Sequence, residues 1–181
     1  MGNYKVSEPE YKTPPQDSYF LDLIWISQVD GSKGPYYRWW WGIADIETQK
    51  EWVGCVASSQ TSLNPTLNNR FGEFLKVILG GIEVDSIGST EDLVKNKYRV
   101  KGFLKHNKPA DKVYCNVDTL IEGTAKKGEG CGYKGAPEFL KEEINVFLKA
   151  KGVPLLEIKE KKATSPKQES ASAPKKQEIP W

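Results

Sequence analysis

The sequence predicts a mainly β protein with five strands, two helices and a disordered tail, and three observations support this class. Five segments rich in β-branched and aromatic residues are separated by Gly, Pro and polar turn residues. Two further segments place apolar residues three and four positions apart, which is typical of amphipathic helices. The chain from about Lys159 onward is composed mainly of Lys, Glu, Ser, Ala, Pro and Gln, a composition that cannot bury a core.

The first three strands are expected to form an antiparallel meander. Residues 19–28 form the first strand, and the two glycines and the proline of segment 30–35 indicate a loop. The second strand covers residues 36–46. A short polar turn at Thr48 and Gln49 then leads to a third strand over residues 51–58.

A helix is expected next, and two more strands follow it. Gly80 and Gly81 mark the end of this helix. Its apolar stripe consists of Phe71, Phe74, Leu75, Ile78 and Leu79. The fourth strand is predicted over residues 93–105, and the fifth over residues 112–122, after a loop at 106–111.

A glycine- and lysine-rich loop over residues 123–135 precedes a second predicted helix, residues 137–151. A proline near its first turn, early glutamates and late lysines are typical of helix ends. Its apolar stripe, expected to dock on the strands, consists of Leu140, Ile144, Phe147 and Leu148.

The element order β-β-β-α-β-β predicts an oligonucleotide/oligosaccharide-binding (OB) barrel, a five-stranded Greek key. An SH3-like barrel and a small β-sandwich are the alternatives. The domain organisation follows from these boundaries. We expect a flexible arm over residues 1–17, the barrel over 18–122, a loop and a docked helix over 123–158, and a disordered tail over 159–181.

Residues 36–41 read Tyr-Tyr-Arg-Trp-Trp-Trp and contain half of the six tryptophans. On a strand, alternate side chains point to opposite faces. Tyr37, Trp39 and Trp41 therefore share one face, which can fill a core. The opposite face would present a second row to flat partners such as unpaired bases. This row consists of Tyr36, Arg38 and Trp40.

An OB barrel binds its ligand across strands 2 and 3 and the loops beside them. Candidate contacts with single-stranded DNA in these places are Lys33, Tyr36, Arg38, Trp39, Trp40, Trp41, Trp52 and Lys108. Rings of this kind stack on bases of any type, although some of them can equally be core residues.

Strand 4 is predicted to carry a basic stripe. Residues 95–112 hold seven basic side chains and one acidic one. Alternate positions on a strand share a face. The stripe then consists of Lys95, Lys97, Arg99 and Lys101, continued by Phe103 and Lys105. We list Lys97, Arg99, Lys101 and Phe103 as DNA contacts. A solvated face or a lysine-guarded edge strand is the alternative interpretation.

Composition narrows the function. The net charge is +2, and it divides into +3 on the tail and −1 on the body, so a nucleic-acid site on the body must be a local patch. Three cysteines and one histidine, without a C-x-x-C pair, favour structural thiols over a zinc site. No catalytic or nucleotide-binding motif is present, so we expect no enzyme, cofactor or metal. The absence of a long apolar run or a signal-like N-terminus predicts a cytoplasmic protein without membrane contact.

The sequence also resembles a known family. The ending Ile179-Pro180-Trp181 is similar to the Ile-Pro-Phe tip of bacterial single-stranded DNA-binding proteins, but Trp replaces Phe and a single glutamate replaces their acidic cluster. Residues 19–122 resemble phage-encoded proteins of this class. The segments that carry this likeness are Arg38-Trp39-Trp40-Trp41, Thr61-Ser62-Leu63-Asn64, residues 93–100 and Tyr114-Cys115-Asn116-Val117-Asp118.

The expected function is sequence-tolerant binding of single-stranded DNA in replication, recombination or repair, with a viral origin implied by the resemblance. RNA as the ligand and homo-oligomer formation stay open. The tail tip is expected to contact a replication or repair protein. The alternatives are a carbohydrate-binding module with the same aromatic platform and a protein-interaction scaffold.

Overall fold

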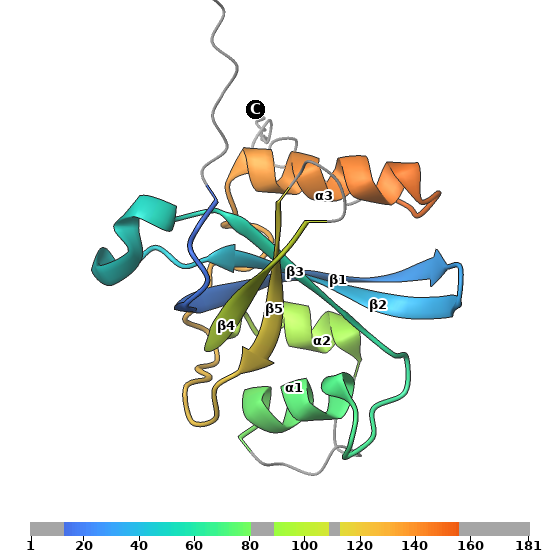
Figure 1. Ribbon diagram of the computed structural model, residues 1–181, viewed down its shortest axis with the longest axis horizontal. Helices are drawn as coiled ribbons and strands as arrows, with labels where there is room; N and C mark the ends of the chain where they lie inside the picture. Colours follow the sequence, from blue (N-terminus) through green and yellow to red (C-terminus); the bar gives the residue numbers. More distant parts are fainter. Residues whose placement is uncertain (1–12, 81–88, 109–112, 156–181) are drawn as a thin grey trace, which may run out of the picture.

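The computed structural model describes residues 13–80, 89–108 and 113–155 (Figure 1). Most of the expected N-terminal arm and the whole tail lie outside these residues. The predicted partner contacts of Ile179, Pro180 and Trp181 therefore lie outside the described residues too.

Five strands form one sheet that closes on itself in the order β1-β2-β3-β5-β4. Neighbouring strands are antiparallel except β3 and β5, which pair in parallel. The strands are β1 (Ser18–Gly31), β2 (Gly34–Ile43), β3 (Val56–Thr61), β4 (Arg99–Asn107) and β5 (Tyr114–Leu120). The prediction of a mainly β protein with five strands is confirmed.

Both predicted helices are present, and two short helical segments accompany them. The four are η1 (Glu47–Trp52), α1 (Arg70–Ile78), α2 (Thr90–Lys95) and α3 (Glu138–Ala150). Helix α1 lies between β3 and β4 in the sequence, as predicted, and Asn69 caps it by accepting a hydrogen bond from the Gly72 amide at 2.9 Å. Among the described residues no helix is long and apolar enough to cross a membrane.

The third strand begins later than predicted. Segment 47–52, which contains Trp52, forms the 3-10 helix η1. The Gln49 side chain is buried there and bonds to the backbone of Phe20 and Ala44, which fixes this segment as a helical turn. Gly54 follows with a positive φ of 81°, and strand β3 starts only at Val56.

The fourth strand also begins later than predicted, because residues 90–95 form helix α2. Ser89 and Asp92 cap this helix reciprocally through each other's backbone amides. Leu93 and Val94 are buried as part of the helix, and Lys97 follows with a φ of 49°. The predicted basic stripe therefore loses Lys95 and Lys97, since neither lies on β4.

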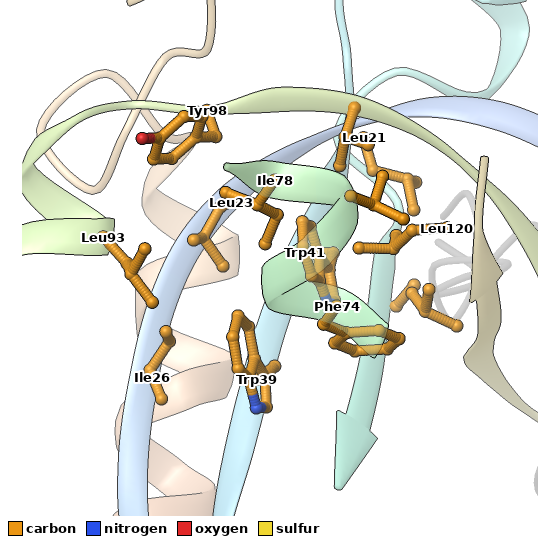
Figure 2. Packing of buried hydrophobic residues seen from close by; sticks show 14 of the residues in the cluster. Leu21, Leu23, Ile26, Trp39, Trp41, Phe74, Ile78, Leu93, Tyr98 and Leu120 are labelled. Carbon is orange, nitrogen blue, oxygen red and sulfur yellow. The ribbon is translucent and has the colours of Figure 1, made fainter. Parts of the chain in front are cut away.

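The protein has two apolar clusters on opposite sides of β1 and β2. The larger one fills the ring and includes Trp39, Trp41 and Phe74, with α1 and α2 closing one end (Figures 1 and 2). The smaller one lies between the outer faces of β1 and β2 and helix α3, and it includes Trp40 and Leu140. Helix α3 thus docks on the sheet with the predicted apolar stripe.

Candidate functional site

The inner row of the aromatic run is core. Trp39 and Trp41 have no exposed surface, and their rings stack at 5.9 Å with an interplanar angle of 7°. The Trp39 indole N–H donates to Thr61 Oγ1 at 2.9 Å, and the Trp41 indole N–H donates to Ser59 Oγ at 3.1 Å. These two rings, which the sequence placed among the candidate base contacts, are closed off from a ligand in this conformation.

Trp40 in the outer row is also covered, which the sequence did not indicate, whereas Tyr36 and Arg38 are half-buried. Trp40 is only 3% exposed, and its ring meets the edge of Phe147 from α3 at 5.1 Å. The expectation of an open outer row at Trp40 is therefore wrong. The physical reason is that the apolar stripe of α3 needs an apolar surface, and the outer face of β2 supplies it.

Arg38 is the cation at the margin of this covered face. Its guanidinium carbon lies 4.5 Å from the Phe147 ring centroid and 5.1 Å from that of Trp40. It forms no ion pair with any residue in the described part of the chain. Its buried Nε has no hydrogen-bond partner there. Burial lowers the pKa of Arg38, while Tyr36, Tyr114 and Glu143 act in the opposite direction.

A lowered pKa of an arginine does not mean that it loses its proton, because guanidinium stays charged in proteins. It means that the loss of hydration outweighs the opposing effects of Tyr36, Tyr114 and Glu143. Burial of the Arg38 charge costs free energy, and a bound anion would offset that cost.

Arg38 lines a groove of about 550 Å³. The groove runs over the outer faces of β2, β3, β5 and the end of β4, between the start of α1 and the late part of α3. The residues that line it are Arg38, Ser59, Gln60, Arg70, Lys105, Asn107, Tyr114, Asn116, Val117, Asp118 and Phe147.

The lining of this groove is basic and rich in hydrogen-bonding groups. It carries three cations, Arg38, Arg70 and Lys105, and one carboxylate, Asp118, which pairs with Lys105 at 3.2 Å. Tyr114 adds a ring that is 43% exposed. The carboxamides of the lining, from Gln60, Asn107 and Asn116, project from β3, β4 and β5. The groove therefore offers phosphate-binding charge, a stacking surface and groups that can bond to base edges.

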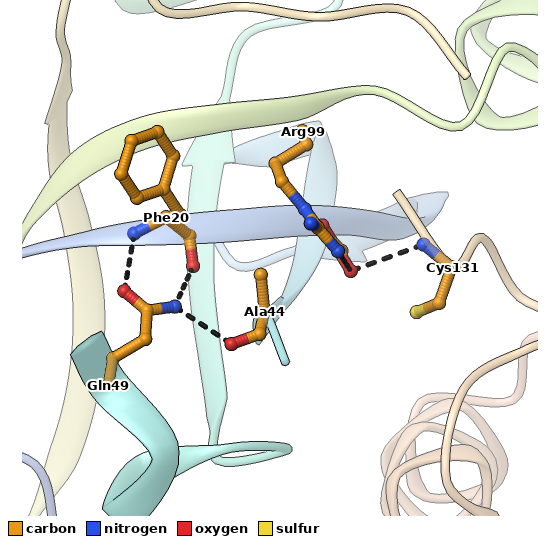
Figure 3. A network of polar contacts seen from close by, with 6 residues as sticks. Phe20, Ala44, Gln49, Arg99 and Cys131 are labelled. Carbon is orange, nitrogen blue, oxygen red and sulfur yellow. Dashed lines mark hydrogen bonds and ion pairs between the residues drawn. The ribbon is translucent and has the colours of Figure 1, made fainter. Parts of the chain in front are cut away.

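One predicted DNA contact has a structural partner instead. Arg99 donates two hydrogen bonds to the buried Asp22, from Nε at 2.7 Å and from Nη2 at 3.1 Å. Asp22 also accepts the Cys131 amide at 3.1 Å (Figure 3). The bond to Asp22 raises the pKa of Arg99. This guanidinium joins β4 to β1 and is not free for a phosphate.

The other candidates are spread over the molecule. Lys33 lies in the two-residue turn of the β1–β2 hairpin, and Trp52 lies half-buried in η1. Lys97 precedes β4, whereas Lys101 and Phe103 point outward from it. Lys108 follows the end of β4. Tyr36 flanks Arg38 on β2 and packs at the edge of the smaller cluster.

Sequence reasoning missed most of the residues that surround Arg38 in the groove. Arg70 was not singled out in the sequence, and Phe147 was assigned only to an apolar stripe. Tyr114 and Asn116 alternate along strand 5, and that alternation was the available signal, because it places both on one face.

The thiols and acids do not form a metal centre in the part of the chain that the structure describes. Burial raises the pKa of Cys115 to about 11 and that of Cys131 to about 12. Both thiols therefore stay protonated near neutral pH.

Comparison with known proteins adds no relative: no family model, curated protein or solved structure matches this chain. The groove itself is therefore the feature that bears on function.

Proposed function

We propose that this protein is an OB-fold protein that binds single-stranded DNA in the groove around Arg38. The strand order β1-β2-β3-β5-β4, the parallel β3–β5 pair and the helix between β3 and β4 support the assignment to this fold. In OB folds the ligand lies on the face of strands 2 and 3, and the groove includes residues of both.

The state of Arg38 is the observation that carries the proposal. A guanidinium that lies beside two rings, is partly desolvated and forms no ion pair with a described residue is arranged to receive a phosphate. Arg70 and Lys105 line the same groove and can contact further phosphates of a bound DNA strand. Tyr114 supplies a ring for one base.

Single-stranded rather than duplex DNA is the proposed ligand because the groove combines cations with a ring and carboxamides. Stacking on Tyr114 and contacts from Gln60 or Asn116 require bases with free faces and edges, which a duplex does not present. The carbohydrate alternative needs a flat, open aromatic row, and the burial of Trp39, Trp40 and Trp41 removes that row.

The test is a titration of a fluorescein-labelled single strand and of the duplex of the same sequence, followed by anisotropy. We expect tighter binding of the single strand and a loss of affinity as salt rises. Arg38→Gln should weaken binding about 10- to 100-fold, because a hydrogen bond to a charged group contributes about 1.5–3 kcal/mol. It should also lower the slope of log affinity against log salt by about one phosphate contact.

Lys149→Gln is the matched control, because this lysine is exposed on α3 and does not line the groove. It should leave the affinity unchanged. Equal affinity for single strand and duplex, or full affinity of a folded Arg38→Gln variant, would contradict the proposal. Circular dichroism of each variant establishes that it is folded.

A further inference from the structure

The outer face of β1 and β4 carries a second aromatic and basic surface, outside the groove. Phe20 on β1 pairs with Lys101 on β4, and Ser18 pairs with Phe103. Both phenyl rings are partly exposed, and Lys101 Nζ lies 5.5 Å from the Phe20 ring centroid. We name these three residues, Phe20, Lys101 and Phe103, the phenylalanine patch.

The backbone of Phe20 in the phenylalanine patch is anchored by a buried side chain. Gln49, which is buried, accepts a hydrogen bond from the Phe20 amide at 3.0 Å and donates one to the Phe20 carbonyl at 2.8 Å (Figure 3). The same carboxamide nitrogen donates to Ala44 at 2.9 Å. A ring whose backbone is fixed in this way loses little further freedom when a ligand stacks on it.

The patch is continuous with the groove along β4. Val100, Gly102 and Leu104 point inward and are buried, so Lys101, Phe103 and Lys105 project outward from the same strand. Lys105 lines the groove. At about 3.3 Å per residue, Phe103 lies about 7 Å along the strand from Lys105.

The charge of this surface fits a polyanion. Lys101 and Lys126 form no ion pair with a described residue, and the backbone of Lys126 bridges to that of Arg99 at the start of β4. Carboxylates also border the surface: Asp118 pairs with Lys105, Glu122 pairs with Lys76 and follows Ile121, whose amide donates to the Lys101 carbonyl, and Asp17 precedes β1. The cations lie at both ends of the two rings, from Lys105 to Lys126.

We propose that a single strand leaving the groove crosses β4 and stacks on the phenylalanine patch, so that the patch extends the binding site. This inference rests on the proposed function of the groove. Charge complementarity and the continuity through Lys105 select a nucleic-acid strand as the occupant rather than an apolar protein partner. Short oligonucleotides occupy the groove alone, whereas longer ones reach both surfaces.

The test compares oligo-dT of about 4 and about 16 nucleotides, the limits of site size for one OB fold. Phe103→Ala should weaken binding of the longer strand at least about fivefold, the equivalent of about 1 kcal/mol for one lost stacking contact. It should leave the affinity for the short strand unchanged. Phe139→Ala is the matched control, because it removes an exposed phenylalanine on α3, and it should change neither affinity.

A second variant, Lys101→Gln, keeps the inference testable if Phe103→Ala fails to fold. It should reduce the salt dependence of binding for the longer strand only. An unchanged affinity for the longer strand in both variants overturns the extension, as does an equal loss for the two lengths. Failure of the wild-type protein to prefer single strands over duplex is a different outcome, because it overturns the proposed function of the groove.

Discussion

The two faces of β2 carry similar side chains in opposite states. On the inner face, Trp39 and Trp41 are stacked, fully buried and satisfied by hydrogen bonds to Thr61 and Ser59. On the outer face, the Trp40 indole N–H and the Arg38 Nε are buried without a partner among the described residues. The inner side chains of this aromatic run therefore have all their indole N–H groups hydrogen-bonded. The outer side chains include two buried N–H groups without a partner among the described residues.

This difference shows which observation identifies a binding face. Aromatic content does not, because both rows are aromatic and both are largely covered. The unmet polar groups do, since buried donors without partners are uncommon in native proteins and each one calls for an explanation. Here one of them, the Arg38 Nε, belongs to a residue that lines a groove with two further cations, Arg70 and Lys105.

The inner face should be the more costly one to damage. Trp39→Ala removes a fully buried ring that packs against Trp41 and, edge-on, against Phe74 at 5.4 Å (Figure 2). We expect the free energy of unfolding to fall by about 3–5 kcal/mol, measured by urea denaturation. Trp52→Ala, which truncates a half-buried ring in η1, is the comparison and should cost less. Equal losses for the two variants would mean that the apolar cluster inside the closed sheet is not the main source of stability.

Two arginines extend the comparison from stability to binding. Arg99→Gln leaves the buried carboxylate of Asp22 without its bidentate partner, so unfolding free energy should fall by about 3 kcal/mol while DNA affinity stays unchanged. Arg38→Gln should show the reverse, with weaker DNA binding and a change in unfolding free energy below about 1 kcal/mol. Urea denaturation and the anisotropy titration measure both quantities. A folded Arg99→Gln variant that loses DNA affinity would show that this pair also serves the site.

Much of the fold could be predicted from local pattern. The alternation along residues 36–41 correctly separated an inner row from an outer row, and the spacing of Phe71, Phe74 and Leu75 correctly indicated α1. The two misplaced strand starts have different causes. The local capping pair Ser89 and Asp92 favoured helix α2 over a strand. The Gln49 side chain stabilised η1 through the backbone of Phe20, 29 positions away.

The site was less predictable because it depends on contacts between distant elements. Arg38 could be named from its place in the aromatic run, but nothing in the sequence says that Phe147 covers Trp40 or that Arg99 pairs with Asp22, 77 positions away. Arg70, Lys105 and Tyr114 enter the groove from three elements, and only the closed sheet brings them together. Which charged side chains can bind a ligand depends on which of them already form ion pairs within the protein. These pairs join residues far apart in the chain, so the sequence alone does not reveal them.

The smallest effect tests the comparison most directly, because Trp39→Phe and Trp40→Phe remove the same indole nitrogen and nearly the same volume from the two faces. Trp39→Phe loses the hydrogen bond to Thr61 and leaves that hydroxyl buried without it, so it should cost about 1–2 kcal/mol more than Trp40→Phe in urea denaturation. Trp40→Phe removes a donor that has no partner among the described residues, and the relief should offset part of the lost ring contact with Phe147. Equal costs for the two substitutions would show that the Trp40 N–H is satisfied in solution. Of the two outer-face groups that lack a partner among the described residues, the Arg38 Nε would then be the one left unmet.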